Sequence, residues 1–263
     1  MMKVKASSLT PGLKLLPNRL DASRALRESQ FVPFFQPIVR LRTGQLKGFE
    51  VLARWRHPVE GLIPPNAFIG IAEQDGWIGE LTGQILQKAF AAAPALPDPL
   101  TLAINISPLQ LGDISLPEQI RTLATKAGFP LSRVVVEITE SALIDNPQSA
   151  STIVTDFKKM GCRLALDDFG TGYSSLSHLQ ALPFDKLKID RSFVDSMTEK
   201  RESRKIVSAV VGLGQSLALT TVAEGIETQE QAEMMLWLGC DLGQGYFYGR
   251  PIPVEELSAC VSA

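Results

Sequence analysis

The stretch "CRLALDDFGTG", residues 162–172, places two adjacent carboxylates, Asp167 and Asp168, between an apolar run and a Gly-Thr-Gly turn. The apolar run shows no alternation with polar residues, which is typical of a parallel strand that is covered on both faces. Adjacent carboxylates at the end of a buried strand repel each other and take up protons unless a positive charge neutralises them. The rest of the chain repeats this pattern of polar residues at strand ends.

Seven further apolar runs indicate strands, and helical patterns separate most of them. Eight strands with helical crossovers predict an α/β fold, a closed (β/α)8 TIM-like barrel. The first two runs are joined by "RLRTGQLK", which is too short for a crossover helix and predicts a hairpin, so one strand is antiparallel. The runs are residues 31–39, 45–55, 100–107, 133–140, 162–169, 185–190, 219–225 and 243–249, and the helical patterns are residues 66–91, 116–127, 147–160, 201–217 and 228–238.

The remaining segments and the composition fit one domain. Residues 1–20 hold Pro11 and Pro17 and predict an N-terminal tail or linker, whereas residues 21–263 form the domain, with a lead-in helix at residues 21–30. The net charge of −2, without a basic run, argues against duplex nucleic acid or an anionic membrane as a partner. No apolar run approaches the roughly 18 residues of a membrane span. The three cysteines lie far apart, without zinc or disulfide spacing, which favours a reduced, cytoplasmic protein.

Polar side chains occur late in six of the predicted strands. The carboxyl ends of barrel strands meet at one rim, so these side chains are expected to converge there. Carboxylate and amide oxygens without His or Cys suit a hard cation such as Mg²⁺ or Mn²⁺. Six ligand residues exceed what one magnesium ion usually takes from protein, so two ions are expected. The residues are Glu50, Asn105, Glu137, Asp167, Asp168 and Glu224, with Lys188 as the one cation among them.

Each of these residues also has a purely structural explanation. A lone Glu at a strand end is more often a salt-bridge partner, and Asn105 could begin a turn. The two aspartates could cap a helix, and Lys188 could be a solvated edge lysine. Their recurrence at corresponding positions favours a site. Elsewhere structural explanations are preferred: His57 beside a proline is expected to be structural, and Trp77 and Trp237 in helical segments are expected to lie in the core.

A set of short motifs gives the chain a family resemblance. It resembles, from about residue 30 to residue 253, the EAL-domain phosphodiesterases that hydrolyse the bacterial second messenger cyclic di-GMP. That family has a (β/α)8 barrel with one antiparallel strand, in agreement with the predicted hairpin. The motifs are "QPI" at 36–38, "EVLARW" at 50–55, "NIS" at 105–107, "EITE" at 137–140, "DDFGTGYSSL" at 167–176, "KLKID" at 186–190, "AEGIE" at 223–227 and "QGYFYGRP" at 244–251.

The resemblance implies roles for single residues. Glu50, Asn105, Glu137, Asp167, Asp168 and Glu224 match the metal-site residues of the family, with Asp167 as the bridge between two ions. Lys188 matches the lysine beside the attacking water, so the catalytic residues implied are Lys188, Glu50 and Asp167. Glu140 and Glu227 match acids that support the loop after Asp168. Residues that match substrate-holding or site-ordering positions are Gln36, Leu52, Arg54, Asp190 and Gln244. The aromatic residues near the rim, Tyr246 among them, could stack on a guanine base.

The Glu-Ala-Leu motif that gives the family its name is Glu50-Val51-Leu52 in this chain, so Val51 stands where Ala is usual. Strand alternation predicts that Glu50 and Leu52 face the mouth and Val51 faces the outer helices, so the change concerns packing. The activity implied is hydrolysis of cyclic di-GMP to linear 5′-pGpG by a metal-activated water.

Other readings of the sequence stay open. The main alternative is a catalytically silent cyclic di-GMP receptor, and a partner-binding scaffold or an enzyme for another phosphodiester is less favoured. The family resemblance also implies a homodimer, and the chain could be the catalytic end of a longer protein with a sensor or regulatory domain.

Overall fold

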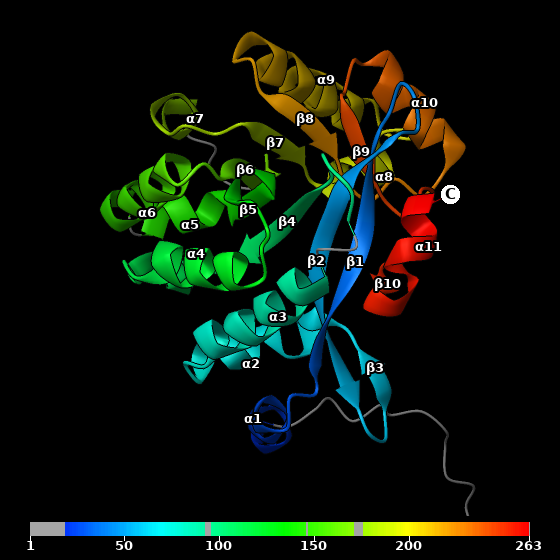
Figure 1. Cartoon of the computed structure of the whole chain (residues 1–263). Coiled ribbons are helices and arrows are strands. Elements are labelled where there is room, and N and C mark those ends of the chain that lie inside the picture. The colour runs from blue at the N-terminus through cyan, green and yellow to red at the C-terminus, as the bar shows by residue number, and fades with distance from the viewer. Residues whose placement is uncertain (1–18, 93–95, 146, 171–175, 263) are drawn as a thin grey trace, which may run out of the picture.

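The computed structural model describes residues 19–92, 96–145, 147–170 and 176–262. In these residues a ten-stranded sheet closes into a barrel, because β1 (Phe31–Arg40) pairs with both β2 (Leu46–His57) and β9 (Leu242–Gln244) (Figure 1). Eight strands form the barrel in the order β1-β9-β8-β7-β6-β5-β4-β2, which confirms the predicted architecture. Two short strands flank it: β3 (Gly61–Ile63) pairs with β2, and β10 (Ile252–Pro253) pairs with β1. The other strands are β4 (Thr101–Ile106), β5 (Val134–Thr139), β6 (Arg163–Phe169), β7 (Lys186–Ile189) and β8 (Thr220–Ala223).

β1 is the antiparallel strand that the short first connection predicts. It runs antiparallel to β2 and β9. The remaining barrel pairs are all parallel: β2–β4, β4–β5, β5–β6, β6–β7, β7–β8 and β8–β9. Residues 41–45 link β1 to β2, and Gly44 adopts the left-handed conformation with φ 69°. Its amide donates to the Arg40 carbonyl at 2.8 Å. The hairpin therefore needs no crossover helix.

Helices cover the outside of the barrel (Figure 1). Their apolar stripes pack on the outward side chains of the strands; α3, for example, buries Leu81, Ile85 and Phe90. The helices are α1 (Arg19–Arg27), α2 (Ile69–Gln74), α3 (Ile78–Ala92), α4 (Leu116–Lys126), α5 (Glu140–Asp145), α6 (Pro147–Lys159), α7 (Leu176–Ala181), α8 (Arg191–Ser196), α9 (Arg201–Ser216), α10 (Gln229–Trp237) and α11 (Leu257–Ser262).

Strand alternation separates two apolar layers. A small cluster that includes Val135 and Ala165 fills the barrel interior, and a larger cluster lies between strands and helices. Val51 belongs to the outer cluster and is 5% exposed, whereas Glu50 and Leu52 line the mouth. The prediction that Val51 is a packing position is confirmed.

Two sequence-based expectations about elements were wrong. The helical pattern at residues 66–91 is divided into a 3-10 turn, α2 and α3, because Gly76 adopts φ 77° and the Trp77 amide bonds back to the Ala72 carbonyl. Such a left-handed glycine ends a helix. The strand expected at residues 243–249 ends at Gln244, after which the amides of Tyr248 and Gly249 both donate to the Gly245 carbonyl.

Trp237 is not a core residue, because its side chain is 80% exposed. It is the last residue of α10, whose buried positions are Gln231, Ala232 and Met235. Position 237 lies two residues beyond Met235, about 200° around the helix, and so faces outward. Trp77, in contrast, is partly buried against the core, as expected.

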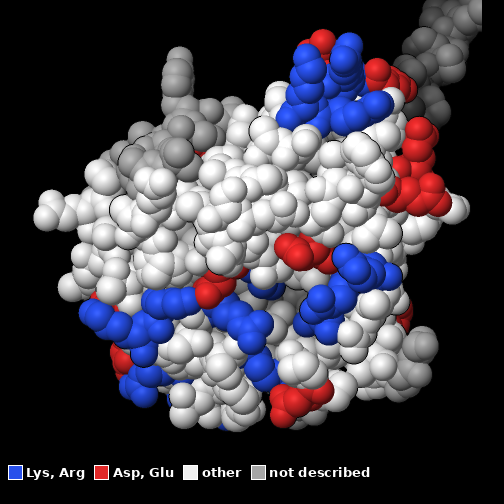
Figure 2. Space-filling model, turned by 90° about the horizontal axis from the view of Figure 1, so that it is seen from above, with Lys and Arg blue, Asp and Glu red and all other residues white. Residues whose placement is uncertain are grey.

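The surface carries charges of both signs. On the face seen in Figure 2, groups of Lys and Arg side chains have Asp and Glu side chains beside them. Among the helices that the structure describes, none is long and apolar enough to cross a membrane.

Candidate metal centre and active site

The strand register brings the predicted polar residues to one end of the barrel. Asn105 on β4 is opposite Glu137 on β5, and Asp167 on β6 is opposite Thr139, two residues further along β5. Glu50 contributes from β2 and Lys188 from β7, while Glu224 directly follows β8. Glu50 lies near the end of the part of β2 that pairs with β4, although β2 itself continues to His57. The other residues lie late in their strands or directly after them, at the end of the barrel where such folds build their sites.

Lys188 lies at the centre of the acidic residues. Its side chain is 1% exposed, and its Nζ lies 2.7 Å from Glu137 Oε2, 2.9 Å from Asp167 Oδ2 and 2.6 Å from Glu224 Oε1. Burial alone would lower the pKa of Lys188, but the surrounding carboxylates raise it well above its usual value. A solvated edge lysine is therefore excluded, and the ammonium keeps its charge.

One ammonium does not neutralise the whole cluster. Burial raises the pKa of Glu137 to about 8, with Glu50 and Asp167 adding to the rise and Lys188 opposing it. Burial also raises the pKa of Asp168 to about 6, with the charge of Asp167 adding to the effect. The pKa of Glu224 is likewise raised well above its usual value by burial. The site therefore needs protons or further positive charge.

The donor atoms fit a hard cation. Asp167, Asp168 and Glu224 each offer a carboxylate oxygen, and these oxygens lie within 4.8 Å of one another. Asp168 adopts φ 55°, in the left-handed region that few non-glycine residues occupy. Asn105 Nδ2 donates to Glu50 Oε1 at 2.6 Å, which holds a further carboxylate beside the cluster. An all-oxygen set of this kind suits Mg²⁺ or Mn²⁺ rather than zinc.

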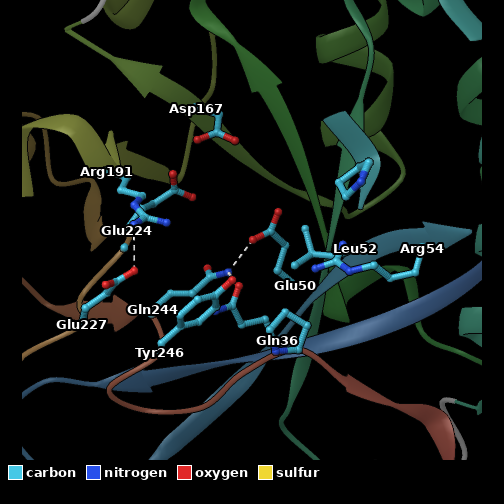
Figure 3. A pocket seen from close by; sticks show the side chains of 14 residues that line it. Gln36, Glu50, Leu52, Arg54, Asp167, Arg191, Glu224, Glu227, Gln244 and Tyr246 are labelled. Carbon is cyan, nitrogen blue, oxygen red and sulfur yellow. Dashed lines mark hydrogen bonds and ion pairs between the residues drawn. The ribbon is translucent and has the colours of Figure 1, made fainter. Parts of the chain in front are cut away.

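A cavity of about 310 Å³ lies over the acidic cluster (Figure 3). Gln244 Nε2 donates to Glu50 and, at 3.0 Å, to Gln36 Oε1, so the wall is ordered by side chains from three strands. Gln244 Oε1 is buried without a hydrogen-bond partner among the described residues, and it is available as an acceptor for a ligand. The predicted residues that line this cavity are Gln36, Glu50, Leu52, Arg54, Asp167, Glu224, Glu227 and Gln244.

Among the predicted supporting residues, Asp190 and Glu140 do not line the cavity, whereas Glu227 does. Asp190 caps α8, where its Oδ1 accepts from the Ser192 amide at 3.0 Å. Glu140 begins α5 and is buried. Glu227 pairs with Arg191 on α8, 2.7 Å from its Nη2. The loop that Glu140 and Glu227 are expected to support, at residues 171–175, lies outside the described residues.

Residues that sequence reasoning missed or left open also line the cavity. Arg191 was missed, although it directly follows the motif "KLKID" that ends at Asp190. Tyr246 is 44% exposed, and the Arg250 guanidinium lies 4.2 Å from the centre of its ring. His57 has the expected structural role, because its Nδ1 accepts from the amides of Val59 and Glu60 in the β2–β3 turn.

Comparison with known proteins places the chain in a family. The family model described as "EAL domain" matches residues 19–251, so the chain belongs to the EAL-domain family, as its motifs indicate. The cyclic di-GMP phosphodiesterase RocR of Pseudomonas aeruginosa is 41% identical over 244 residues, which cover 92% of this chain and 62% of RocR. An uncharacterized signaling protein of Caulobacter vibrioides is 43% identical over 92% of this chain and 30% of its own length.

A solved structure agrees with this placement. The PaMucR phosphodiesterase in complex with c-di-GMP has a TM-score of 0.87 at 37% identity, covering 90% of this chain and 98% of that one. The chain thus spans between about a third and two thirds of the length of the curated relatives named above.

Proposed function

We propose that this chain is a metal-dependent phosphodiesterase that hydrolyses cyclic di-GMP to linear 5′-pGpG. The observation that carries the proposal is the buried Lys188 within 2.9 Å of three carboxylates, beside a cavity that Arg54 also lines. A relative that is 41% identical is named a cyclic di-GMP phosphodiesterase, which supports the choice of substrate.

The six candidate ligands would form two groups that share Asp167. Asp167, Asp168 and Glu224 would hold one Mg²⁺ or Mn²⁺ ion, and Glu50, Asn105 and Glu137 would hold a second, with Asp167 shared between them. When bound, such ions supply Lewis acidity to the phosphate and lower the pKa of a water molecule.

The chain's own residues hold and orient the reactants. Lys188 places its ammonium beside the attacking water, where its positive charge can stabilise the negative charge that develops during the reaction. The water oxygen forms a bond to phosphorus in line with the ribose 3′ oxygen, the P–O3′ bond breaks, and the 3′ oxygen takes up a proton. Arg54 suits the phosphate because a guanidinium can donate two parallel hydrogen bonds.

The remaining contacts concern the bases and sugars. Gln36, Leu52 and Gln244 line the cavity, and we assign them to substrate binding. Asp190 lies outside the cavity wall as a helix cap, so its contribution would be to order the segment that follows Lys188. Glu140 and Glu227 remain assigned to supporting neighbouring loops.

The setting of the enzyme is part of the same proposal. Cys162, Cys240 and Cys260 are free thiols, which supports a reduced, cytoplasmic location. Curated relatives extend well beyond the matched region, which supports fusion to a sensor or regulatory domain. We also propose a homodimer, on the family resemblance.

The test is hydrolysis of cyclic di-GMP with Mg²⁺, followed by chromatography of the nucleotides. The parent should form pGpG, Glu50→Gln should not, and Glu80→Gln on the outer helix α3 should match the parent. Tight nucleotide binding by the parent without turnover would favour the receptor alternative. If the parent neither binds nor hydrolyses cyclic di-GMP, both the phosphodiesterase proposal and the receptor alternative are contradicted.

A further inference from the structure

Arg191 spans the gap between two segments of the site. It is the first residue of α8, three positions after Lys188, and its side chain reaches across to the segment after β8 (Figure 3). Its Nε donates to Asp195 Oδ2 at 2.9 Å, and its Nη2 donates to Glu227 Oε1 at 2.7 Å. Arg191 therefore joins the segment that carries Lys188 to the segment that carries Glu224.

The Arg191 side chain packs against the backbone at Gly225, where there is no room for a larger residue. Gly225 adopts φ 69°, and a Cβ built there would lie 2.2 Å from Arg191 Cγ and 2.8 Å from its Cβ and Cδ. The aliphatic part of Arg191 thus lies directly on the glycine that follows Glu224. A larger residue at 225 would displace Arg191, so the glycine and the arginine fit as a pair.

The segment from Glu224 to Glu227 is fixed at its backbone on both sides. The Glu224 amide donates to the Ile189 carbonyl at 3.2 Å, and the Ile226 amide donates to the Gln244 carbonyl at 3.0 Å. Between these bonds, Arg191 covers Gly225 with its stem and holds Glu227 with its guanidinium. Glu224 itself reaches Lys188 at 2.6 Å and is one of the three clustered cation donors.

We propose that Arg191, paired with Glu227, is a positioning residue that fixes Glu224 for binding a divalent cation. This inference rests on the metal site of the proposed function. A direct contact with the substrate phosphate is less consistent with the geometry, because two carboxylates already face the Arg191 guanidinium. The described contacts of Arg54 are a backbone carbonyl and the Phe34 ring, which leaves its charge available to an anion.

The sign of the effect separates positioning from simple electrostatics. Arg191 is a positive charge near the cation site, so on electrostatics alone its removal would strengthen cation binding. If Arg191 holds Glu224 in place, its removal weakens binding instead, by about tenfold as for other residues that orient metal ligands. Arg191→Met keeps most of the aliphatic stem and removes the charge and its two hydrogen bonds.

The experiment is Mn²⁺ titration of the full chain by calorimetry, with no nucleotide present. Arg191→Met and Glu227→Gln should each weaken Mn²⁺ binding by about tenfold. The double variant should be no weaker than either single variant, because the two changes remove one shared interaction. The matched control pair is Arg121→Met and Glu118→Gln on α4, an ion pair of comparable exposure outside the site, which should leave Mn²⁺ affinity unchanged.

Kinetics and unfolding complete the test. The KM for cyclic di-GMP of Arg191→Met at saturating Mn²⁺ should stay near the parent value, and its Tm in EDTA should match that of Arg121→Met. Unchanged or tighter Mn²⁺ binding, additive losses in the double variant, or a raised KM with unchanged Mn²⁺ affinity would each overturn the inference. A parent chain that binds no Mn²⁺ would overturn the metal-dependent function itself. A parent that binds Mn²⁺, with variants of the same Mn²⁺ affinity, would overturn only the role inferred for Arg191.

Discussion

At the scale of single residues, the site depends on opposite charges that are buried together. The Lys188 ammonium is almost fully buried, yet three carboxylate oxygens within 2.9 Å keep it charged. The same carboxylates depend on the lysine, because a buried acid without a positive partner takes up a proton or destabilises the fold. Removing Lys188 or one of these carboxylates should therefore lower the stability of the fold by more than the loss of its hydrogen bonds alone, because it leaves a buried charge without a partner.

Lys188→Met should lower stability in a manner that depends on pH. The change keeps the length of the side chain but leaves buried acids without their cation, which we expect to cost about 3–5 kcal/mol at pH 8. Acids with raised pKa in the folded state bind protons more readily than in the unfolded chain, so the loss should shrink as the pH falls toward 5. Urea unfolding at several pH values checks this. A loss that is equal at pH 5 and pH 8 would contradict the prediction.

Asp168→Asn should stabilise the metal-free protein at neutral pH. The folded pKa of Asp168 is about 6, above the ordinary value of 3.8, so the ionised form is disfavoured by folding above pH 6. Removing that charge should add about 1–2 kcal/mol at pH 7.5 after allowance for solvent screening, and the gain should disappear as the pH falls below the ordinary value of 3.8. Asn also tolerates the left-handed backbone at this position. Thermal unfolding in EDTA measures the gain; excess Mg²⁺ should reverse the order of the two proteins.

At the scale of elements, two helix glycines show how closely the helices approach the barrel. Gly214 of α9 faces β8, and a Cβ there would lie 2.4 Å from Thr221 Cγ2. Thr221 is fully buried, and its backbone amide and hydroxyl both donate to Asp241 Oδ2, so its side chain is not free to turn away. Gly212, two residues earlier in the same helix, has open space around the corresponding position.

Gly214→Ala and Gly212→Ala should therefore have opposite effects. The first should lower the free energy of unfolding by about 1–3 kcal/mol through overpacking. The second should raise it by about 0.5–1 kcal/mol, because alanine is the better helix former. Denaturant unfolding of both variants is the measurement. In a Thr221→Ser background, which lacks Cγ2, the loss from Gly214→Ala should shrink; an undiminished loss would show that the clash lies elsewhere.

The elements that could be predicted are those with a repeated pattern. Apolar runs located the barrel strands, and the polar residues at their ends located the acidic cluster, because strand direction alone decides where those ends meet. The break at Gly76 and the early end of β9 at Gln244 depend on single glycines inside otherwise regular runs. The role of Arg191 depends on Gly225 and Glu227, which are distant in sequence and adjacent only in the folded chain. Trp237 shows that an apolar residue off the buried stripe of its helix faces outward.

At the scale of the whole molecule, the packed barrel controls access to the thiols. Cys162 and Cys240 are buried, and burial raises the pKa of the first to about 11 and of the second to about 12. The reactive form of cysteine is the thiolate, so both should be inert in the folded protein at pH 8. Cys260 lies on α11 and is partly exposed.

Thiol labelling at pH 8 should accordingly show one fast and two slow reactions. Cys260 should react first, and Cys162 and Cys240 should react at the rate at which the barrel opens. Cys260→Ser should remove the fast phase and leave the slow one. Rapid labelling of Cys162 in that variant would show that the barrel opens locally far more often than its packing indicates.

The pairing of β1 with β9 and β10 has a consequence for the order of events during synthesis. Gln36 meets Gln244 across 208 positions of sequence, and β10 then pairs with β1 at Phe34 and Phe35. While the chain emerges from the ribosome, β1 and β2 can form their hairpin early, but the barrel stays open until the region around residue 244 has been made. The cavity, whose wall needs Gln36, Glu50 and Gln244 together, therefore cannot form before residue 244 has been made, and a nascent chain has no complete site until then.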